Sequence, residues 1–96
     1  MTLPLGDVQS SILVVDDEEP VRAAIARQLR LHGYTILTAS TGPAALDIVR
    51  REKVAAILLD THLPGTSVIE LVPALLELEP SLAILMLSAV QDATTA

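Results

Sequence analysis

Four short, almost continuously apolar stretches recur along the chain. They are residues 11–15, 34–39, 54–59 and 82–87. A strand with one solvated face would alternate apolar and polar residues, whereas a strand buried on both faces is apolar nearly throughout. We therefore predict four strands, of which the first, at residues 11–15, is buried on both of its faces.

The segment after the first strand predicts a helix. Glu18-Glu19-Pro20 is a helix-start signal, and Gly33 fits the left-handed position that ends a helix. Apolar residues recur between them at helical spacing, and these are Val21, Ala24, Ile25 and Leu29.

Three further helices are predicted. In one, the segment Ser40-Thr41-Gly42-Pro43 supplies a turn and then the helix start, and the helix ends near Arg50-Arg51-Glu52-Lys53. Another occupies residues 68–78. Pro73 lies inside the latter, and proline in a helix interior costs about 3 kcal/mol. That helix is therefore either kinked or begins just before Pro73. Residues 91–96 resemble the first turns of a last helix.

Strands that alternate with helices imply a parallel sheet with right-handed crossovers and helices on both faces. We predict an α/β fold with a doubly wound parallel sheet. Residues 1–10 contain Pro, Gly and Asp without periodicity, so we expect a flexible lead-in followed by one domain over residues 11–96.

Composition excludes several classes of protein. The chain has 96 residues, a net charge of −6 and no cysteine. The absence of cysteine excludes disulfides and a cysteine nucleophile, and the negative charge argues against nucleic-acid binding. The longest apolar runs have six residues, whereas a membrane span needs about 20. With no signal-peptide pattern at the start, we expect a cytoplasmic protein without membrane association.

Oxygen-bearing side chains follow three of the predicted strands. Asp16 and Asp17 follow the first strand, Asp60 the third and Ser88 the fourth. In an open parallel sheet, ligands bind beyond the carboxyl ends of the strands. Two carboxylates about 4 Å apart repel by about 4 kcal/mol at an effective dielectric of about 20, so they require a cation or a retained proton.

An all-oxygen set of ligands favours a hard ion such as Mg²⁺. A carboxylate beside Mg²⁺ can accept a phosphoryl group. The competing interpretation is that each aspartate simply caps a helix or lies in a turn.

The same residues carry a resemblance to a known family. The motifs are Ile12–Glu18, Gly33–Ala39, Ile57–Asp60 with the following Leu63-Pro64-Gly65, and Leu87-Ser88-Ala89. Together, at these spacings, they closely resemble the CheY-like receiver domain of two-component response regulators. The resemblance covers residues 11–96 and implies a flavodoxin-like sheet.

The resemblance implies a role for each site residue. Asp60 would accept a phosphoryl group from a sensor histidine kinase. Asp17 would bind Mg²⁺ directly and Asp16 mainly through water. Asp60 and the backbone carbonyl of His62 would complete the protein ligands, and Ser88 would be the switch hydroxyl that moves toward the phosphoryl group.

The sequence also departs from the family pattern. Ser67-Val68 stands where the family usually has an acidic residue or Asn followed by Gly. The family continues with a fifth strand that ends in an invariant lysine and with a last helix, whereas the only lysine here is Lys53. We therefore expect a truncated receiver with strand order 2-1-3-4, with the fifth strand and last helix missing. Its exposed fourth strand would be prone to self-association.

Two functions remain open at this point. The chain is either a phosphoacceptor module or a receiver-derived interaction or dimerisation fragment that is not usefully switched. In neither case is it an enzyme beyond slow self-dephosphorylation. Phosphatases of the haloacid-dehalogenase type need a second aspartate two residues after the nucleophile, where this chain has His62.

Overall fold

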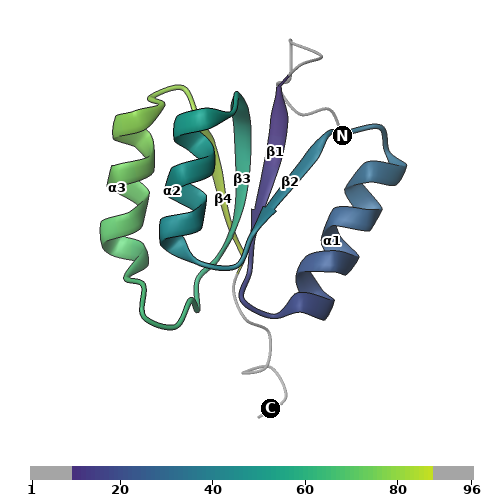
Figure 1. The fold of residues 1–96 in the computed structure, drawn as a ribbon, viewed down its shortest axis with the longest axis horizontal. Coiled ribbons are helices and arrows are strands. Elements are labelled where there is room, and N and C mark those ends of the chain that lie inside the picture. Colours follow the sequence, from purple (N-terminus) through teal and green to yellow (C-terminus); the bar gives the residue numbers. More distant parts are fainter. Residues whose placement is uncertain (1–9, 88–96) are drawn as a thin grey trace.

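The computed structural model describes residues 10–87 and contains one four-stranded parallel sheet with helices on both faces (Figure 1). The strand order is β2-β1-β3-β4, which confirms the predicted topology. The lead-in up to residue 9, Ser88 and the helix expected over 91–96 lie outside the described residues. The elements are β1 (Ser11–Val15), α1 (Glu19–Leu31), β2 (Ile36–Ala39), α2 (Gly42–Arg51), β3 (Val54–Asp60), α3 (Val68–Leu78) and β4 (Ala83–Leu87).

The central position of β1 explains why its sequence is apolar from Ile12 to Val15. It pairs with β2 on one side and with β3 on the other, and all five of its residues are buried. Helix α1 covers one face of the sheet, while α2 and α3 cover the other (Figure 1). Alternate residues of β1 therefore enter two separate cores. Ile12 and Val14 pack on the α1 side, and Leu13 and Val15 pack on the α2 and α3 side.

Helix α1 is where the predicted buried face is partly wrong. Val21 is 41% exposed and Ala24 is also exposed, whereas Ala26 is buried against the sheet with Ile25 and Leu29 beside it. The helix has more apolar residues than one face can bury, so spacing alone left its orientation open. The predicted end is confirmed, because Gly33 has a φ of 91° and its N–H donates to the carbonyl of Arg30.

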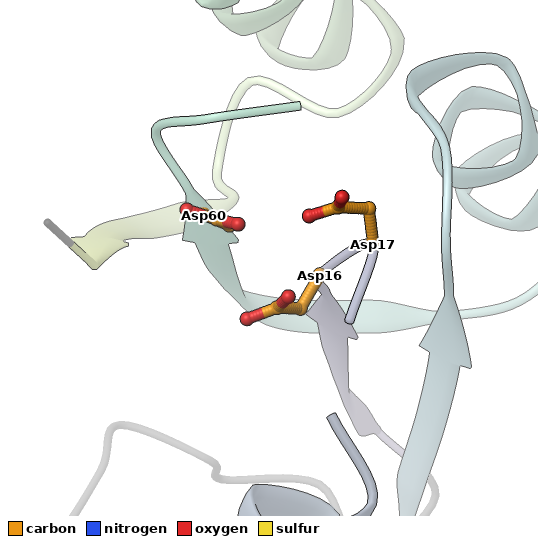
Figure 2. Close-up of side chains that lie close together, drawn as sticks. All are labelled: Asp16, Asp17 and Asp60. Atoms are coloured by element: carbon orange, nitrogen blue, oxygen red, sulfur yellow. The ribbon is translucent and has the colours of Figure 1, made fainter. Parts of the chain in front are cut away.

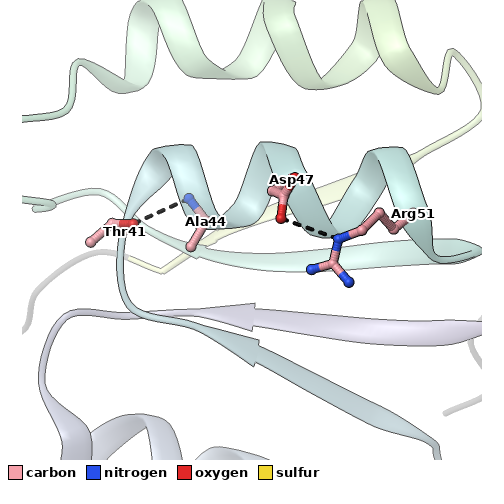
Figure 3. A network of polar contacts seen from close by, with 4 residues as sticks. All are labelled: Thr41, Ala44, Asp47 and Arg51. Carbon is pink, nitrogen blue, oxygen red and sulfur yellow. Dashed lines mark hydrogen bonds and ion pairs between the residues drawn. The ribbon is translucent and has the colours of Figure 1, made fainter.

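Helix α2 begins where its sequence predicts. The side-chain oxygen of Thr41 accepts the N–H of Ala44 at 3.2 Å, which satisfies one of the free donors of the first turn (Figure 3). Asp47 and Arg51 form an i,i+4 ion pair at 3.1 Å on the exposed side (Figure 3). An exposed pair of this kind contributes about 0.3–0.5 kcal/mol. Packing against the sheet is therefore the larger stabilising contribution to α2.

Helix α3 runs continuously through Pro73. The alternative that the helix begins just before Pro73 is therefore wrong. Pro73 lies on the exposed side of α3, and the carbonyl that loses its helical donor belongs to Ile69, which is itself 86% exposed. Water can satisfy such a carbonyl, while Leu71 and Leu75 anchor the opposite side of the helix in the core.

Strand ends differ from prediction by one or two residues. Asp60 is the last residue of β3 rather than the first residue of the following loop, and β2 begins at Ile36 rather than Tyr34. Strand β4 begins at Ala83, because the N–H of Leu82 donates to the carbonyl of Glu79 in a turn. Within residues 10–87, no helix combines the length and apolar character that crossing a membrane requires.

Candidate functional site

Three aspartates meet at the carboxyl edge of the sheet. Asp16 directly follows β1, Asp17 is the next residue, and Asp60 ends β3. Because Val15 pairs with Leu59 in the parallel register, the residues that come next lie side by side. One carboxylate oxygen of each lies within 4.8 Å of the others, and the side chains share the space beyond the strand ends (Figure 2). We call Asp16, Asp17 and Asp60 the acidic cluster.

Asp16 is held by its backbone and by its side chain. It is only 5% exposed, and its N–H donates to the carbonyl of Ala39 at 3.1 Å. Its Oδ1 accepts the N–H of Glu18 at 2.9 Å, and its carbonyl accepts a hydrogen bond from Nη1 of Arg22 at 2.8 Å. Its position is therefore determined before any ligand binds.

Asp60 is held on one of its two oxygens. Its Oδ1 accepts the N–H of His62 at 3.0 Å, and the residue is 9% exposed. The N–H of Thr61 donates to the carbonyl of Leu87 at 3.2 Å, which continues the link between β3 and β4 past the end of the strand. The side chain of Asp17 is exposed. The cluster thus combines two fixed, buried carboxyl groups with one that solvent reaches.

The electrostatics of the cluster favour a cation. Burial raises the pKa of Asp16, and the neighbouring charges of Asp60 and Asp17 raise it further. The hydrogen bond from Glu18 and the charge of Arg22 act in the opposite direction. Negative charge in the cluster is therefore incompletely compensated by the protein's own groups.

The donor set fits a hard divalent ion. All three ligand side chains are carboxylates, and magnesium and calcium prefer oxygen ligands. Their separation allows three oxygens to approach one ion, which would reduce the mutual repulsion of the aspartates. Among residues 10–87, this is the group whose geometry suits a metal.

Replacing Asp16 with asparagine tests the electrostatic description. Because the pKa of Asp16 is raised in the folded protein, the folded state holds this proton more tightly than the unfolded chain, whose carboxyl has the ordinary value of 3.8. This group therefore makes the metal-free protein less stable as the pH rises from below 3.8 through the folded pKa. Asparagine carries no charge and can still accept the N–H of Glu18.

We expect Asp16→Asn to melt at a higher temperature than wild type at about pH 7 in the presence of a chelator, with the difference vanishing near about pH 3. Thermal unfolding followed by circular dichroism at the two pH values measures this. A variant that is less stable than wild type at neutral pH would mean that the charge of Asp16 does not destabilise the metal-free protein.

Two further residues were predicted for the site, His62 and Ser88. The backbone N–H of His62 contacts Asp60, and its ring is exposed. Ser88 lies outside the described residues. From the sequence, no role was assigned to Arg22, whose side chain contacts the carbonyl of Asp16. A cation five residues after an acidic pair, at the start of a helix, is the signal that could have identified it.

The fold and the acidic cluster together define a class of protein, namely a doubly wound parallel α/β domain with clustered carboxylates at the carboxyl edge of its sheet. The sequence matches the response regulator receiver domain over residues 12–96, and the chain belongs to this family. It is therefore a receiver domain, and such domains are signalling modules.

Relatives and solved structures agree with this assignment. The phosphate regulon transcriptional regulatory protein PhoB of Pseudomonas aeruginosa is 44% identical over 84 residues, a match that covers 85% of this chain and 37% of PhoB. The chain thus spans little more than a third of the length of this relative.

Two structurally similar proteins are also response regulators. One, from Burkholderia pseudomallei, was solved with a phosphorylated aspartic acid, a calcium ion and citrate; its TM-score is 0.77 at 34% identity, covering 82% of this chain and 46% of that one. The other, TrrA of Thermotoga maritima, was solved with Mg²⁺-BeF. Its TM-score is 0.78 at 30% identity, and the match covers 90% of this chain and 75% of the TrrA chain. TrrA was also solved in complex with the histidine kinase ThkA, with a TM-score of 0.76 at 32% identity and coverage of 83% and 69%.

Proposed function

We propose that this chain is a phosphoacceptor module of a two-component signalling system, which takes a phosphoryl group from a histidine kinase onto Asp60 with Mg²⁺. The observation that carries the proposal is the acidic cluster, in which Asp60 lies within 4.8 Å of two further carboxylates. The second oxygen of Asp60 makes no hydrogen bond within the described residues, so it is available as a nucleophile.

The proposed reaction is a transfer between two side chains. An oxygen of Asp60 attacks the phosphorus of a kinase phosphohistidine, a P–O bond forms, and the P–N bond breaks. The electron pair goes to the departing imidazole nitrogen, which takes up a proton. The N–H of His62 holds the other oxygen of Asp60 and so orients the carboxylate for the attack.

A bound Mg²⁺ would supply positive charge where phosphoryl oxygens gather negative charge. We propose that Asp17 binds it directly, that Asp16 acts mainly through water, and that Asp60 and the carbonyl of His62 complete the ligands. Ser88 would donate its hydroxyl to the phosphoryl group. The Mg²⁺-BeF complex of TrrA supports a divalent metal at this site, and the phosphorylated aspartic acid of the Burkholderia protein supports an aspartate as the acceptor.

Phosphorylation would change the charge at this edge by about −1.5 to −2. A partner that binds the phosphorylated form of the surface with a different affinity than the unphosphorylated form would then respond to the change. We place this module in the cytoplasm, without contact to nucleic acid or membrane, and slow hydrolysis of its own phosphoryl group is the one catalytic activity that we propose for it. The net charge of −6 supports the absence of nucleic-acid binding.

Incubation with acetyl phosphate tests the proposal. We expect intact-mass spectrometry to show one phosphoryl adduct per chain in the presence of Mg²⁺ and none when a chelator removes the metal. Because the donor is a small molecule, the test needs no knowledge of the kinase. A protein that stays unmodified under these conditions contradicts the proposal.

One observation favours the second candidate, an interaction fragment that associates with itself. Strand β4 lies at the edge of the sheet formed by the described residues, and Leu85 and Met86 are 44% and 47% exposed. An exposed apolar edge strand favours pairing with another chain. We expect the 96-residue chain to form dimers in light scattering and Leu85→Lys to shift it toward monomer. A protein that stays monomeric at every concentration contradicts this candidate.

A further inference from the structure

We infer that Arg22 is a positioning residue that holds the Asp16–Glu18 turn in the shape required for binding a divalent cation. The inference rests on the proposed function, because it concerns the same magnesium site. It adds a residue that lies outside the acidic cluster and contacts it only through the backbone.

Arg22 makes hydrogen bonds to both ends of the turn, one from its side chain and one from its backbone. Nη1 of Arg22 donates to the backbone carbonyl of Asp16 at 2.8 Å, and this contact is partly buried. The backbone N–H of Arg22 donates to the carbonyl of Glu18 at 2.9 Å. The N–H of Glu18 in turn donates to Oδ1 of Asp16 at 2.9 Å, which closes a ring of hydrogen bonds around the turn.

Asp17 lies in the chain between Asp16 and Glu18, the two residues that this ring connects. Its own side chain is exposed and makes no hydrogen bond within the described residues. The direction of its carboxylate therefore depends on the backbone of Asp16 and Glu18, which the ring holds in place. Without the guanidinium, the turn would have to be ordered when the cation binds, and that ordering weakens the affinity.

The charge of Arg22 has the opposite effect on affinity. A positive charge next to Asp16 repels an incoming cation, so its removal alone would strengthen the binding of Mg²⁺. The two effects differ in sign, which makes the inference testable. If positioning dominates, a variant that has lost the positive charge still binds the cation more weakly.

The experiment is a titration of the full 96-residue chain with Mg²⁺ alone, by calorimetry at constant pH and ionic strength. We expect Arg22→Met to weaken the affinity by about tenfold, as the loss of residues that orient metal ligands commonly does. Arg22→Lys, which keeps a donor that can reach the carbonyl, should recover most of the loss. Arg27→Met, at an exposed arginine of the same helix, is the matched control and should bind like wild type.

A second readout follows the turn itself. Amide hydrogen exchange at Glu18 should accelerate in Arg22→Met and stay unchanged in Arg27→Met. Unfolding without Mg²⁺ shows whether each variant is folded. Should Arg22→Met not fold, Arg22→Gln takes its place with the same expected weakening, because glutamine lacks the guanidinium and the charge.

Different outcomes separate this inference from the proposed function. If wild type does not bind Mg²⁺, or binds it no better than Asp17→Asn, the proposed site fails and the inference fails with it. If wild type binds Mg²⁺, Asp17→Asn does not, and Arg22→Met binds as tightly as wild type or more tightly, only the inference is overturned.

Discussion

Replacing Asp60 with asparagine is expected to abolish phosphorylation of the protein by acetyl phosphate while leaving the fold intact. The amide is a far weaker nucleophile than a carboxylate, and the transfer has no other acceptor in the proposed mechanism. The fold should survive because the amide oxygen can still accept the N–H of His62, which now bonds to Oδ1 of Asp60. The variant also removes one of three mutually repelling charges.

Intact-mass spectrometry measures the loss, and circular dichroism checks the fold. Asp47→Asn is the matched control, because Asp47 is an exposed aspartate on α2 outside the acidic cluster, and it should be phosphorylated like wild type. A phosphoryl adduct that persists in Asp60→Asn would show that the acceptor is another residue.

Replacing Leu13 with alanine is expected to cause a large loss of stability. Leu13 lies in the middle of β1, pairs with Leu37 and Ile57 in the neighbouring strands, and has no exposed surface. Truncating a buried leucine costs about 2–5 kcal/mol, because apolar burial is lost and a cavity remains. Small domains have a total stability of about 5–15 kcal/mol, so this is a large fraction.

Urea unfolding followed by circular dichroism measures the difference in the free energy of unfolding. Leu31→Ala is the control, since Leu31 is 70% exposed on α1, and it should change stability by less than about 0.5 kcal/mol. Equal losses in the two variants would mean that the interior around β1 is not packed as described.

Several features of this protein follow from the sequence alone. The stretch at residues 11–15, apolar from Ile12 onward, predicted a strand buried on both faces, and all five residues of β1 are buried. The alternation of strands and helices predicted parallel pairing. Parallel pairing then requires Asp16 and Asp60, which close two adjacent strands, to lie at the same edge of the sheet.

Only the tertiary structure decided the features that depend on contacts distant in sequence or on the rotation of a helix. Ala26 rather than Ala24 is buried in α1, because packing against the sheet selects one of several apolar faces. Helix α3 continues through Pro73, because Leu71 and Leu75 anchor it in the core while Pro73 remains exposed. Helix propensities of single residues do not predict such outcomes. An unfavourable residue such as proline is tolerated when apolar residues elsewhere in the same helix are buried.

At the acidic cluster, the contribution of the sequence and that of the tertiary structure can be separated most clearly. The spacing of the aspartates along the chain was sufficient to predict that they converge, because strand topology alone brings them together. The contact between Arg22 and the carbonyl of Asp16 depends instead on how α1 leaves the sheet and on the conformation of one long side chain. The residues of the acidic cluster could therefore be predicted from the sequence. The hydrogen bonds that the surrounding backbone and Arg22 make to them could be seen only in the tertiary structure, because they depend on how distant parts of the chain pack.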